Sequence, residues 1–375
     1  MDALRLLSGD AQAFRDKVWA SHVHVHHTDP AALTALLSLD DVDHLLTSVA
    51  LRTPALRLVR DGTVLPSSRF TRSASLAGSP LTGLVDARKV LDLFDEGATV
   101  VLQGLHRYWP PLTRLVRELE LGLGHPCQAN AYLTPPGSQG FARHSDTHDV
   151  FVFQTHGHKQ WEILEGAESR EVLLEPGVSM YLPTGTPHSA RSQESASLHV
   201  TVGINRLTWR DLLRAVTERL LADERYAAPL PAGYLHEPDR LAEPLAAELA
   251  AHVRELQAVD PAELVEWRVA GFLRERTPAL RGGLEDRVHL GEMDDDTHLE
   301  RRATAACVLR PGPEKLSVLL GDRELRVPRH LLEPLTFVRD HPGFRVGELS
   351  PWLDAPSRLV LARRLVREGL LRIVR

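Results

Sequence analysis

A histidine and an aspartate two residues apart, His144 and Asp146, are well placed to hold one metal ion together. Residues i and i+2 of an extended strand point to the same face, so the imidazole and the carboxylate can reach the same ion. The run DVFVFQ that follows is β-branched and aromatic, as strands are. Gly157 interrupts it before KQWEIL, which predicts a β-hairpin with a Gly-containing turn.

A second histidine is needed, because the facial triad of non-haem Fe(II) oxygenases combines two histidines with one carboxylate. The best candidate is His188 in SMYLPTGTPHSA, where a short apolar strand enters a Pro/Gly turn. The rival is His199 in ASLHVTVGI, whose apolar neighbours favour a packing role. A His-x-Asp pair alone is a weak signal among 19 histidines. The prediction therefore rests on the pair, the turn and their spacing together.

Polar residues at a period of two precede the pair. Asn130, Tyr132 and Thr134 alternate onto one face of a strand that Pro135 and Pro136 end. Beside a metal pair, this pattern predicts the inside of a barrel that binds a polar ligand.

These residues carry a resemblance to a known family. The pattern NxYLTPPGSQGFxxHxDxxDVFxxQxxGxKxW, followed by YLPxGxPHxA and SLHVTxG, resembles the ribosomal oxygenases. They are JmjC/cupin-type oxygenases that depend on Fe(II) and 2-oxoglutarate. The resemblance is dense across about residues 130–205 and fair across the helical and C-terminal parts.

The resemblance implies a role for individual residues. His144, Asp146 and His188 fall on the metal ligands, and Lys159 falls on the basic residue that binds the distal carboxylate of 2-oxoglutarate. A lone cation inside a barrel needs an anionic partner, which agrees with that role. The alternative is an exposed lysine of the hairpin. Asn130, Tyr132 and Thr134 would help to line the same cosubstrate pocket.

Composition describes an ordinary globular protein. The chain has 375 residues, 43% of them hydrophobic, and a formal net charge of −6. This charge provides no global basic field for nucleic acid or an anionic membrane. Two cysteines, distant in sequence, exclude a disulfide scaffold and fit a reducing cytoplasm. We expect no signal peptide and no membrane span, because the N-terminus has acidic residues and no long apolar run.

The predicted fold class is mixed α+β, with three parts. Residues 1–205 would form a double-stranded β-helix of the JmjC/cupin type decorated by N-terminal helices. Here we expect a hairpin at 54–71 turning at Asp61-Gly62, a helix at 85–97, a strand at 98–109 and a helix from Pro110. The histidines of 22–27, SHVHVHH, are interpreted as exposed imidazoles on an edge segment rather than a metal site.

Amphipathic helices follow in residues 206–285, with apolar residues at three- and four-residue spacing. The resemblance implies a helical dimerisation module, so we expect a homodimer. Packing of these helices against the barrel is the alternative. The acidic stretch 281–301 is interpreted as a linker and a domain boundary.

Residues 300–375 read as strands, helices and a terminal strand, an order typical of a winged-helix domain. Its basic helix carries Arg358, Arg363, Arg364 and Arg367, yet the chain is acidic and one helix face must be solvated. Binding of duplex DNA is therefore not expected.

The favoured function is an Fe(II)- and 2-oxoglutarate-dependent dioxygenase that uses O2 to hydroxylate a protein side chain. The resemblance implies an arginine or histidine of a ribosomal protein as substrate. Hydroxylation of a small molecule or a natural-product peptide remains open, because substrate choice depends on surrounding loops. Two non-enzymatic functions also remain open: a ligand-sensing winged-helix regulator and a metal-binding cupin without redox chemistry. Succinate formation would separate the enzyme from the last two.

Overall fold

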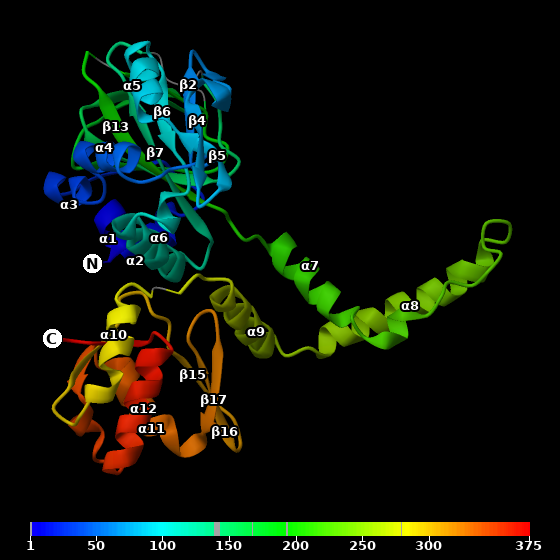
Figure 1. Cartoon of the computed structure of the whole chain (residues 1–375). Coiled ribbons are helices and arrows are strands. Elements are labelled where there is room, and N and C mark those ends of the chain that lie inside the picture. The colour runs from blue at the N-terminus through cyan, green and yellow to red at the C-terminus, as the bar shows by residue number, and fades with distance from the viewer. Residues whose placement is uncertain (1, 139–142, 167, 193, 279) are drawn as a thin grey trace. The chain divides into compact units, whose positions relative to one another are not determined.

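The computed structural model describes residues 2–138, 143–166, 168–192, 194–278 and 280–375. It divides into two compact units, Met1–Arg206 and Leu207–Arg375 (Figure 1). Part of the motif that carries the family resemblance, residues 139–142, lies outside the described residues.

The first unit is mixed α+β. Its helices are α1 (Ala3–Ser8), α2 (Ala11–Ala13), α3 (Pro30–Thr34), α4 (Leu39–Thr47), α5 (Ala87–Asp95) and α6 (Pro110–Leu123). Its strands are β1 (His24–His27), β2 (Leu56–Arg60), β3 (Thr63–Val64), β4 (Thr71–Leu76), β5 (Ser79–Val85), β6 (Thr99–Leu102), β7 (Cys127–Thr134), β8 (Asp149–His156), β9 (Lys159–Glu165), β10 (Glu168–Leu174), β11 (Val178–Leu182), β12 (His188–Ser192) and β13 (Ser197–Ile204).

Local sequence explains where these helices begin. Pro110 occupies the first turn of α6, as expected of a residue that lacks the N–H a helix start leaves unused. Ser38 and Asp41 form a capping box at α4, in which the Asp41 N–H donates to Ser38 Oγ at 3.1 Å. α1 and α6 lie side by side in Figure 1, and the Ala3 N–H donates to Glu118 Oε2.

Two sheets form the barrel. The larger has the strand order β1-β11-β8-β13-β7-β6-β2-β3, and the smaller has the order β10-β9-β12. Strand β8 shows why both faces of the large sheet are buried: Phe151 and Phe153 join the core beneath the helices, whereas Val150 and Val152 pack with β9 and β11 inside the barrel. Side chains that alternate along a strand thus serve two cores.

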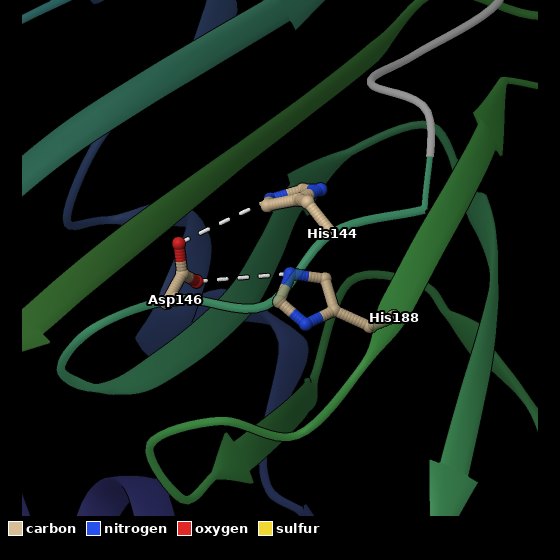
Figure 2. Close-up of side chains that lie close together, drawn as sticks. All are labelled: His144, Asp146 and His188. Atoms are coloured by element: carbon tan, nitrogen blue, oxygen red, sulfur yellow. Dashed lines mark ion pairs between the residues drawn. The ribbon is translucent and has the colours of Figure 1, made fainter.

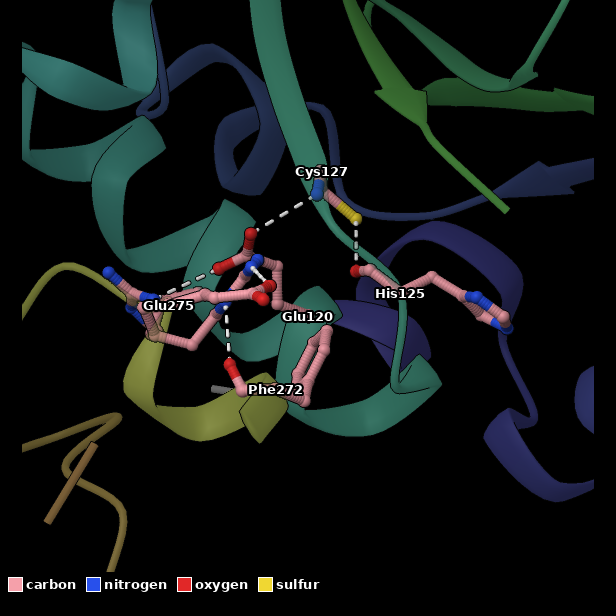
Figure 3. A network of polar contacts seen from close by, with 7 residues as sticks. Glu120, His125, Cys127, Phe272 and Glu275 are labelled. Carbon is pink, nitrogen blue, oxygen red and sulfur yellow. Dashed lines mark hydrogen bonds and ion pairs between the residues drawn. The ribbon is translucent and has the colours of Figure 1, made fainter. Parts of the chain in front are cut away.

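The entry into β7 is fixed by buried polar contacts (Figure 3). The Cys127 N–H donates to Glu120 Oε1 of α6 at 3.2 Å, and the Cys127 thiol donates to the His125 carbonyl at 3.4 Å. Glu120 is 6% exposed. Because Asn130, Tyr132 and Thr134 follow on this strand, α6 sets the starting position of one pocket wall.

The predicted elements between residues 54 and 109 are only partly correct. β2 and β3 form the expected hairpin at Asp61-Gly62. The chain then makes a short 3-10 turn and a second, unexpected hairpin, β4–β5. The strand expected over 98–109 is confined to β6, because Gly104 adopts a positive φ of 66° and a 3-10 turn follows.

The histidines near the N-terminus lie on an edge strand, as expected, because β1 is at the end of the large sheet. The expectation of exposed imidazoles is wrong for His24 and His26, which are half-buried. His24 Nε2 lies 3.1 Å from the Ser8 carbonyl. The His26 ring packs against Gly9, where a Cβ atom would come within 2.9 Å of it.

The second unit begins with three helices, α7 (Trp209–Leu220), α8 (Asp239–Ala258) and α9 (Pro261–Arg274). Thr208 and Asp211 form a capping box at α7. At the end of α9, Arg276 Nε donates to the Phe272 carbonyl at 3.1 Å, part of the contacts drawn in Figure 3. α8 has no buried residue over its 20 positions.

The rest of the second unit packs around a separate core. Its helices are α10 (Gly283–His289), α11 (Leu332–Asp340) and α12 (Ala355–Arg367). Its strands form two sheets, β18-β14-β19 and β15-β16-β17; the bounds are β14 (His298–Arg301), β15 (Val308–Pro311), β16 (Lys315–Leu319), β17 (Glu324–Pro328), β18 (Gly343–Arg345) and β19 (Leu371–Ile373).

The stretch 281–301 is not a linker, contrary to expectation. It contains α10 and β14, and Asp286 of α10 is 5% exposed. This carboxylate pairs with Arg302 and accepts a hydrogen bond from the Ile373 N–H at 3.0 Å. A segment that reads as acidic and polar is thus held by a buried ion pair, which composition alone does not reveal.

Three arginines of α12 are occupied by partners in their own unit. Arg358 pairs with Asp295, Arg363 donates to the Met293 carbonyl, and Arg364 pairs with Glu368. These contacts give the basic helix a structural role. Across the described residues, no helix is long and apolar enough to cross a membrane.

Candidate metal centre

The structure brings His144, Asp146 and His188 together (Figure 2). His144 Nε2 lies 3.9 Å from Asp146 Oδ1, and His188 Nε2 lies 3.7 Å from Asp146 Oδ2. One potential ligand atom from each residue lies within 4.8 Å of the others. Two imidazoles and one carboxylate, converging from one side, are the donor set of a facial triad and suit Fe(II).

Backbone pairing holds the two histidines in register. The His144 N–H donates to the His188 carbonyl at 3.0 Å, and the His188 N–H donates back to the His144 carbonyl at 2.8 Å. This isolated bridge joins the loop after residue 142 to the start of β12. The ligand spacing is therefore set by main-chain hydrogen bonds as well as by side-chain packing.

The orientation of His188 is also fixed. Its Nδ1 lies 2.9 Å from the Thr186 carbonyl, which orients Nε2 toward Asp146. Such a hydrogen bond selects the tautomer in which the other nitrogen is free to bind a metal. Burial lowers the pKa of His188, which favours the neutral imidazole that a metal requires.

Asp149 anchors the turn that carries His188, and sequence reasoning missed it. Its Oδ1 accepts hydrogen bonds from the Thr184 N–H at 2.8 Å and the Thr184 hydroxyl at 2.6 Å. Its Oδ2 accepts one from the Tyr181 hydroxyl at 2.5 Å, and Arg206 Nε lies 3.3 Å from Oδ1. The sequence signal for this role is an acidic residue at the start of the buried strand DVFVFQ, where a carboxylate needs partners.

Lys159 lies inside the barrel rather than on an exposed hairpin. It starts β9 and is 3% exposed. Its Nζ donates to Thr134 Oγ1 at 3.2 Å, and Thr99 Oγ1 donates to the same hydroxyl at 3.3 Å. No carboxylate of the described chain forms an ion pair with Lys159. Burial lowers its pKa from 10.5 to about 8, because the amine loses its hydration.

A single cavity of about 350 Å³ joins Lys159 to His144, Asp146 and His188. Asn130, Tyr132 and Thr134 line it, as their spacing predicted. Asn130 Oδ1 also accepts a hydrogen bond from the Gly104 N–H at 2.9 Å. The cavity is large enough and polar enough for a small dicarboxylate that reaches from the cation to a metal.

His199 lines the same cavity but does not belong to the cluster of potential metal-binding side chains. Its ring stacks on the Tyr132 ring, with 4.9 Å between the ring centroids. The Trp161 ring lies edge-on to it, with 5.7 Å between the centroids. Burial lowers its pKa well below the ordinary value, so the ring is neutral. These contacts agree with a packing role for His199 and leave His188 beside the pair.

Comparisons with known proteins match the part of the chain that contains these side chains. The JmjC domain family matches residues 111–171 and 165–212. A Branchiostoma floridae bifunctional lysine-specific demethylase and histidyl-hydroxylase NO66 is 36% identical over 160 residues, which cover 41% of this chain and 26% of that protein. Human ribosomal oxygenase 1 is 27% identical over 227 residues, covering 54% of this chain and 34% of that protein.

The solved structures extend the likeness in fold. Escherichia coli YcfD, a ribosomal oxygenase determined in complex with cobalt and 2-oxoglutarate, aligns with a TM-score of 0.55 and 17% identity. The alignment covers 98% of this chain and 99% of the YcfD chain. At this identity the likeness concerns the fold alone.

The fold and the matched model define a JmjC domain over residues 111–212, the type of domain found in 2-oxoglutarate oxygenases. Among these oxygenases, the chain is related to the ribosomal oxygenases. It spans only about a quarter to two fifths of the length of the curated relatives it matches.

Proposed function

We propose that this protein is an Fe(II)- and 2-oxoglutarate-dependent hydroxylase of protein side chains, with an arginine or histidine of a ribosomal protein as substrate. The observation that carries the proposal is one cavity holding both the His144–Asp146–His188 cluster and the buried, unpaired cation of Lys159. The relatives named ribosomal oxygenases and histidyl-hydroxylases support the substrate class.

His144, Asp146 and His188 would hold the iron, and Lys159 with Thr134 would hold the distal carboxylate of 2-oxoglutarate. Bound Fe(II) supplies the activation of dioxygen that couples conversion of 2-oxoglutarate to succinate and carbon dioxide with hydroxylation of a C–H bond. The protein orients the reactants and excludes water from the barrel. The packed Tyr132–His199–Trp161 side chains form the apolar part of that wall.

The role of Lys159 follows from its surroundings. A protonated amine at 3% exposure without an anionic partner is costly, and a carboxylate that enters the cavity removes that cost. Binding of the cosubstrate is therefore favoured by the charge that the apo protein leaves uncompensated. Thr134, already in contact with Nζ, supplies a hydroxyl donor to the same carboxylate.

We also propose three domains: a catalytic domain at 1–205, a helical dimerisation domain at 206–285 and a winged-helix-like domain at 300–375, to whose core Leu290, Met293 and Leu299 of the preceding segment also contribute. Support for a homodimer comes from apolar side chains that α7 and α8 expose. Trp209 is 78% exposed, Leu213 59%, Leu249 57% and Val253 50%. The partnered arginines of α12 favour a winged helix that does not bind DNA. Two free cysteines suit the cytoplasm.

The test is succinate formation. Purified protein supplied with Fe(II), oxygen and 2-oxoglutarate should release succinate, and a total ribosomal-protein digest should gain 16 Da on particular peptides. Omission of Fe(II) or 2-oxoglutarate should abolish both signals. Succinate that forms with a small molecule but with no protein would replace the proposed substrate class and keep the chemistry.

A further inference from the structure

A second cation, Arg57, lines the cavity that contains the proposed iron and cosubstrate sites. It lies on β2, between the buried residues Leu56 and Leu58, and is itself half-buried. Because neighbours on a strand point to opposite faces, Leu56 and Leu58 enter the helix-covered core, whereas Arg57 points into the barrel.

Strand register places Arg57 beside Tyr132. Arg57 pairs with Val101 of β6, Val101 pairs with Tyr132 of β7, and Tyr132 pairs with His199 of β13. Side chains at paired positions share one face of a sheet. The guanidinium reaches past Val101 to Tyr132, where its charge and a side-chain hydrogen bond oppose the rise that burial produces in the pKa of Tyr132.

The guanidinium has donors to spare. Arg57 Nε is buried without a hydrogen-bond partner, and no ion pair to Arg57 is formed within the described chain. A buried donor of a charged group that lacks an acceptor is costly, so such groups are usually found opposite a ligand. The five donors of a guanidinium suit a carbonyl, a neutral imidazole nitrogen or a carboxylate.

The other charged side chains of the cavity indicate which ligand Arg57 can bind. Among the described residues that line it, Asp146 is the one carboxylate, and Lys159 is the one other lysine or arginine. Asp146 would be taken up by the metal, and Lys159 by the distal carboxylate of the cosubstrate. The charge of Arg57 then stays uncompensated until the substrate enters.

We infer that Arg57 determines substrate specificity: its guanidinium binds an acceptor on the substrate side chain, alongside the Tyr132 hydroxyl, and excludes cationic side chains. This inference rests on the proposed function. A histidine, asparagine or aspartate side chain offers the acceptor that Arg57 Nε lacks. An arginine or lysine side chain would bring a like charge toward Arg57 in a cavity with no free carboxylate to receive it.

We assign Arg57 to the substrate rather than to 2-oxoglutarate because of where Arg57 and Lys159 lie along β7. Lys159 contacts Thr134, whereas Arg57 lies beside Tyr132, two residues earlier on the strand and one side-chain pair nearer to Asn130. The two cations are thus offset along the cavity wall. The deeper cation accounts for the distal carboxylate, which leaves Arg57 free for a different group.

The experiment uses five peptide libraries with random flanks and a fixed central histidine, asparagine, aspartate, lysine or arginine. The full-length protein, loaded with Fe(II) and 2-oxoglutarate, is compared with Arg57→Gln, which loses the charge and keeps donors. Arg60→Gln is the matched control, since Arg60 is on the same strand and pairs with Glu96 outside the cavity. Hydroxylation of the central residue is read by mass spectrometry, and 2-oxoglutarate affinity by titration.

Wild type and Arg60→Gln should hydroxylate libraries with an acceptor at least tenfold better than the lysine and arginine libraries. Arg57→Gln should lose most of this selectivity for acceptor libraries, whereas its affinity for 2-oxoglutarate should change less than twofold. Efficient hydroxylation of arginine or lysine by wild type, or an unchanged ratio in Arg57→Gln, would overturn the inference. So would a tenfold loss of 2-oxoglutarate affinity, or succinate release without any modified peptide. If wild type releases no succinate, the proposed function itself has failed.

Discussion

Lys159 Nζ donates to Thr134 Oγ1 at 3.2 Å inside the barrel, where it has no anionic partner among the described residues. A hydroxyl cannot neutralise an ammonium group, so the pair is incomplete without a carboxylate. This relationship between β9 and β7 favours a ligand with a carboxylate even before a metal is considered.

Replacing Lys159 should weaken 2-oxoglutarate binding much more than metal binding. Loss of a hydrogen bond to a charged group costs roughly 1.5–3 kcal/mol, which corresponds to about ten- to a hundred-fold in the dissociation constant. Lys159→Met should show this loss in a 2-oxoglutarate titration, whereas the exposed Lys17→Met should match wild type. Equal affinities in the two variants would mean that another cation holds the cosubstrate.

Binding of 2-oxoglutarate should also weaken at alkaline pH. Burial lowers the pKa of Lys159 to about 8 in the apo protein, and a bound carboxylate favours the protonated amine. Affinity should therefore be constant below pH 8 and fall about tenfold per pH unit above it. Calorimetric titrations at pH 7 to 10 would measure this fall. Lys159→Met should remove it, and a wild-type profile that stays flat to pH 10 would contradict it.

The same group should affect the stability of the apo protein in the opposite direction. Below pH 8, Lys159 is protonated in both folded and unfolded chains, so the cost of its burial is fully present. Between about 8 and 10.5 the folded state loses the proton first, and stability relative to Lys159→Met should rise by up to roughly 3 kcal/mol. Urea unfolding of both proteins at pH 7 and 10 measures whether the stability difference changes in this direction.

Replacing Asp149 should loosen the turn that carries His188. Asp149→Asn removes the charge that Tyr181, Thr184 and Arg206 share, at a cost of about 2–3 kcal/mol in the free energy of unfolding. The exposed Asp43→Asn should be near wild type. Denaturant unfolding measures the difference. If metal affinity stayed unchanged in a folded Asp149→Asn protein, the proposed link to His188 would be wrong.

The apolar face of α8 should support a homodimer. Leu249 and Val253 are exposed and lie four residues apart, on one face of the helix. A charged residue at both positions should prevent this face from packing against the apolar face of a second copy. Light scattering should give a dimer for wild type and a monomer for the Leu249→Glu, Val253→Glu double variant. Leu76→Glu, on the exposed hairpin strand β4, is the control and should remain dimeric. A monomeric wild type at micromolar concentration would contradict the proposal.

The strands that bear the cluster could be predicted because their signals are local. His144 and Asp146 lie two residues apart, and the turn before His188 is marked by Pro183, Gly185 and Pro187. Lys159 was harder, because a lysine after Gly157 is equally typical of an exposed hairpin. Its burial depends on the pairing of β9 with β10 and β12.

Other features depend on contacts distant in sequence. In LRLVR, the alternation of apolar and charged residues would normally place Arg57 in solvent, yet pairing of β2 with β6 turns it into the cavity. The stretch 281–301 reads as a linker because its carboxylates look solvated. The partner of Asp286, Arg302, lies 16 residues further on and becomes apparent only in the fold.

The most direct test of the account is an anaerobic titration of apo-protein with Fe(II) and then 2-oxoglutarate, followed by visible absorption. Wild type and His199→Ala should develop the charge-transfer band of iron chelated by 2-oxoglutarate. Ala variants of His144, Asp146 and His188 should each lose the band while remaining folded by circular dichroism. A full band in His188→Ala together with its loss in His199→Ala, or no band in wild type, would contradict the proposed metal centre.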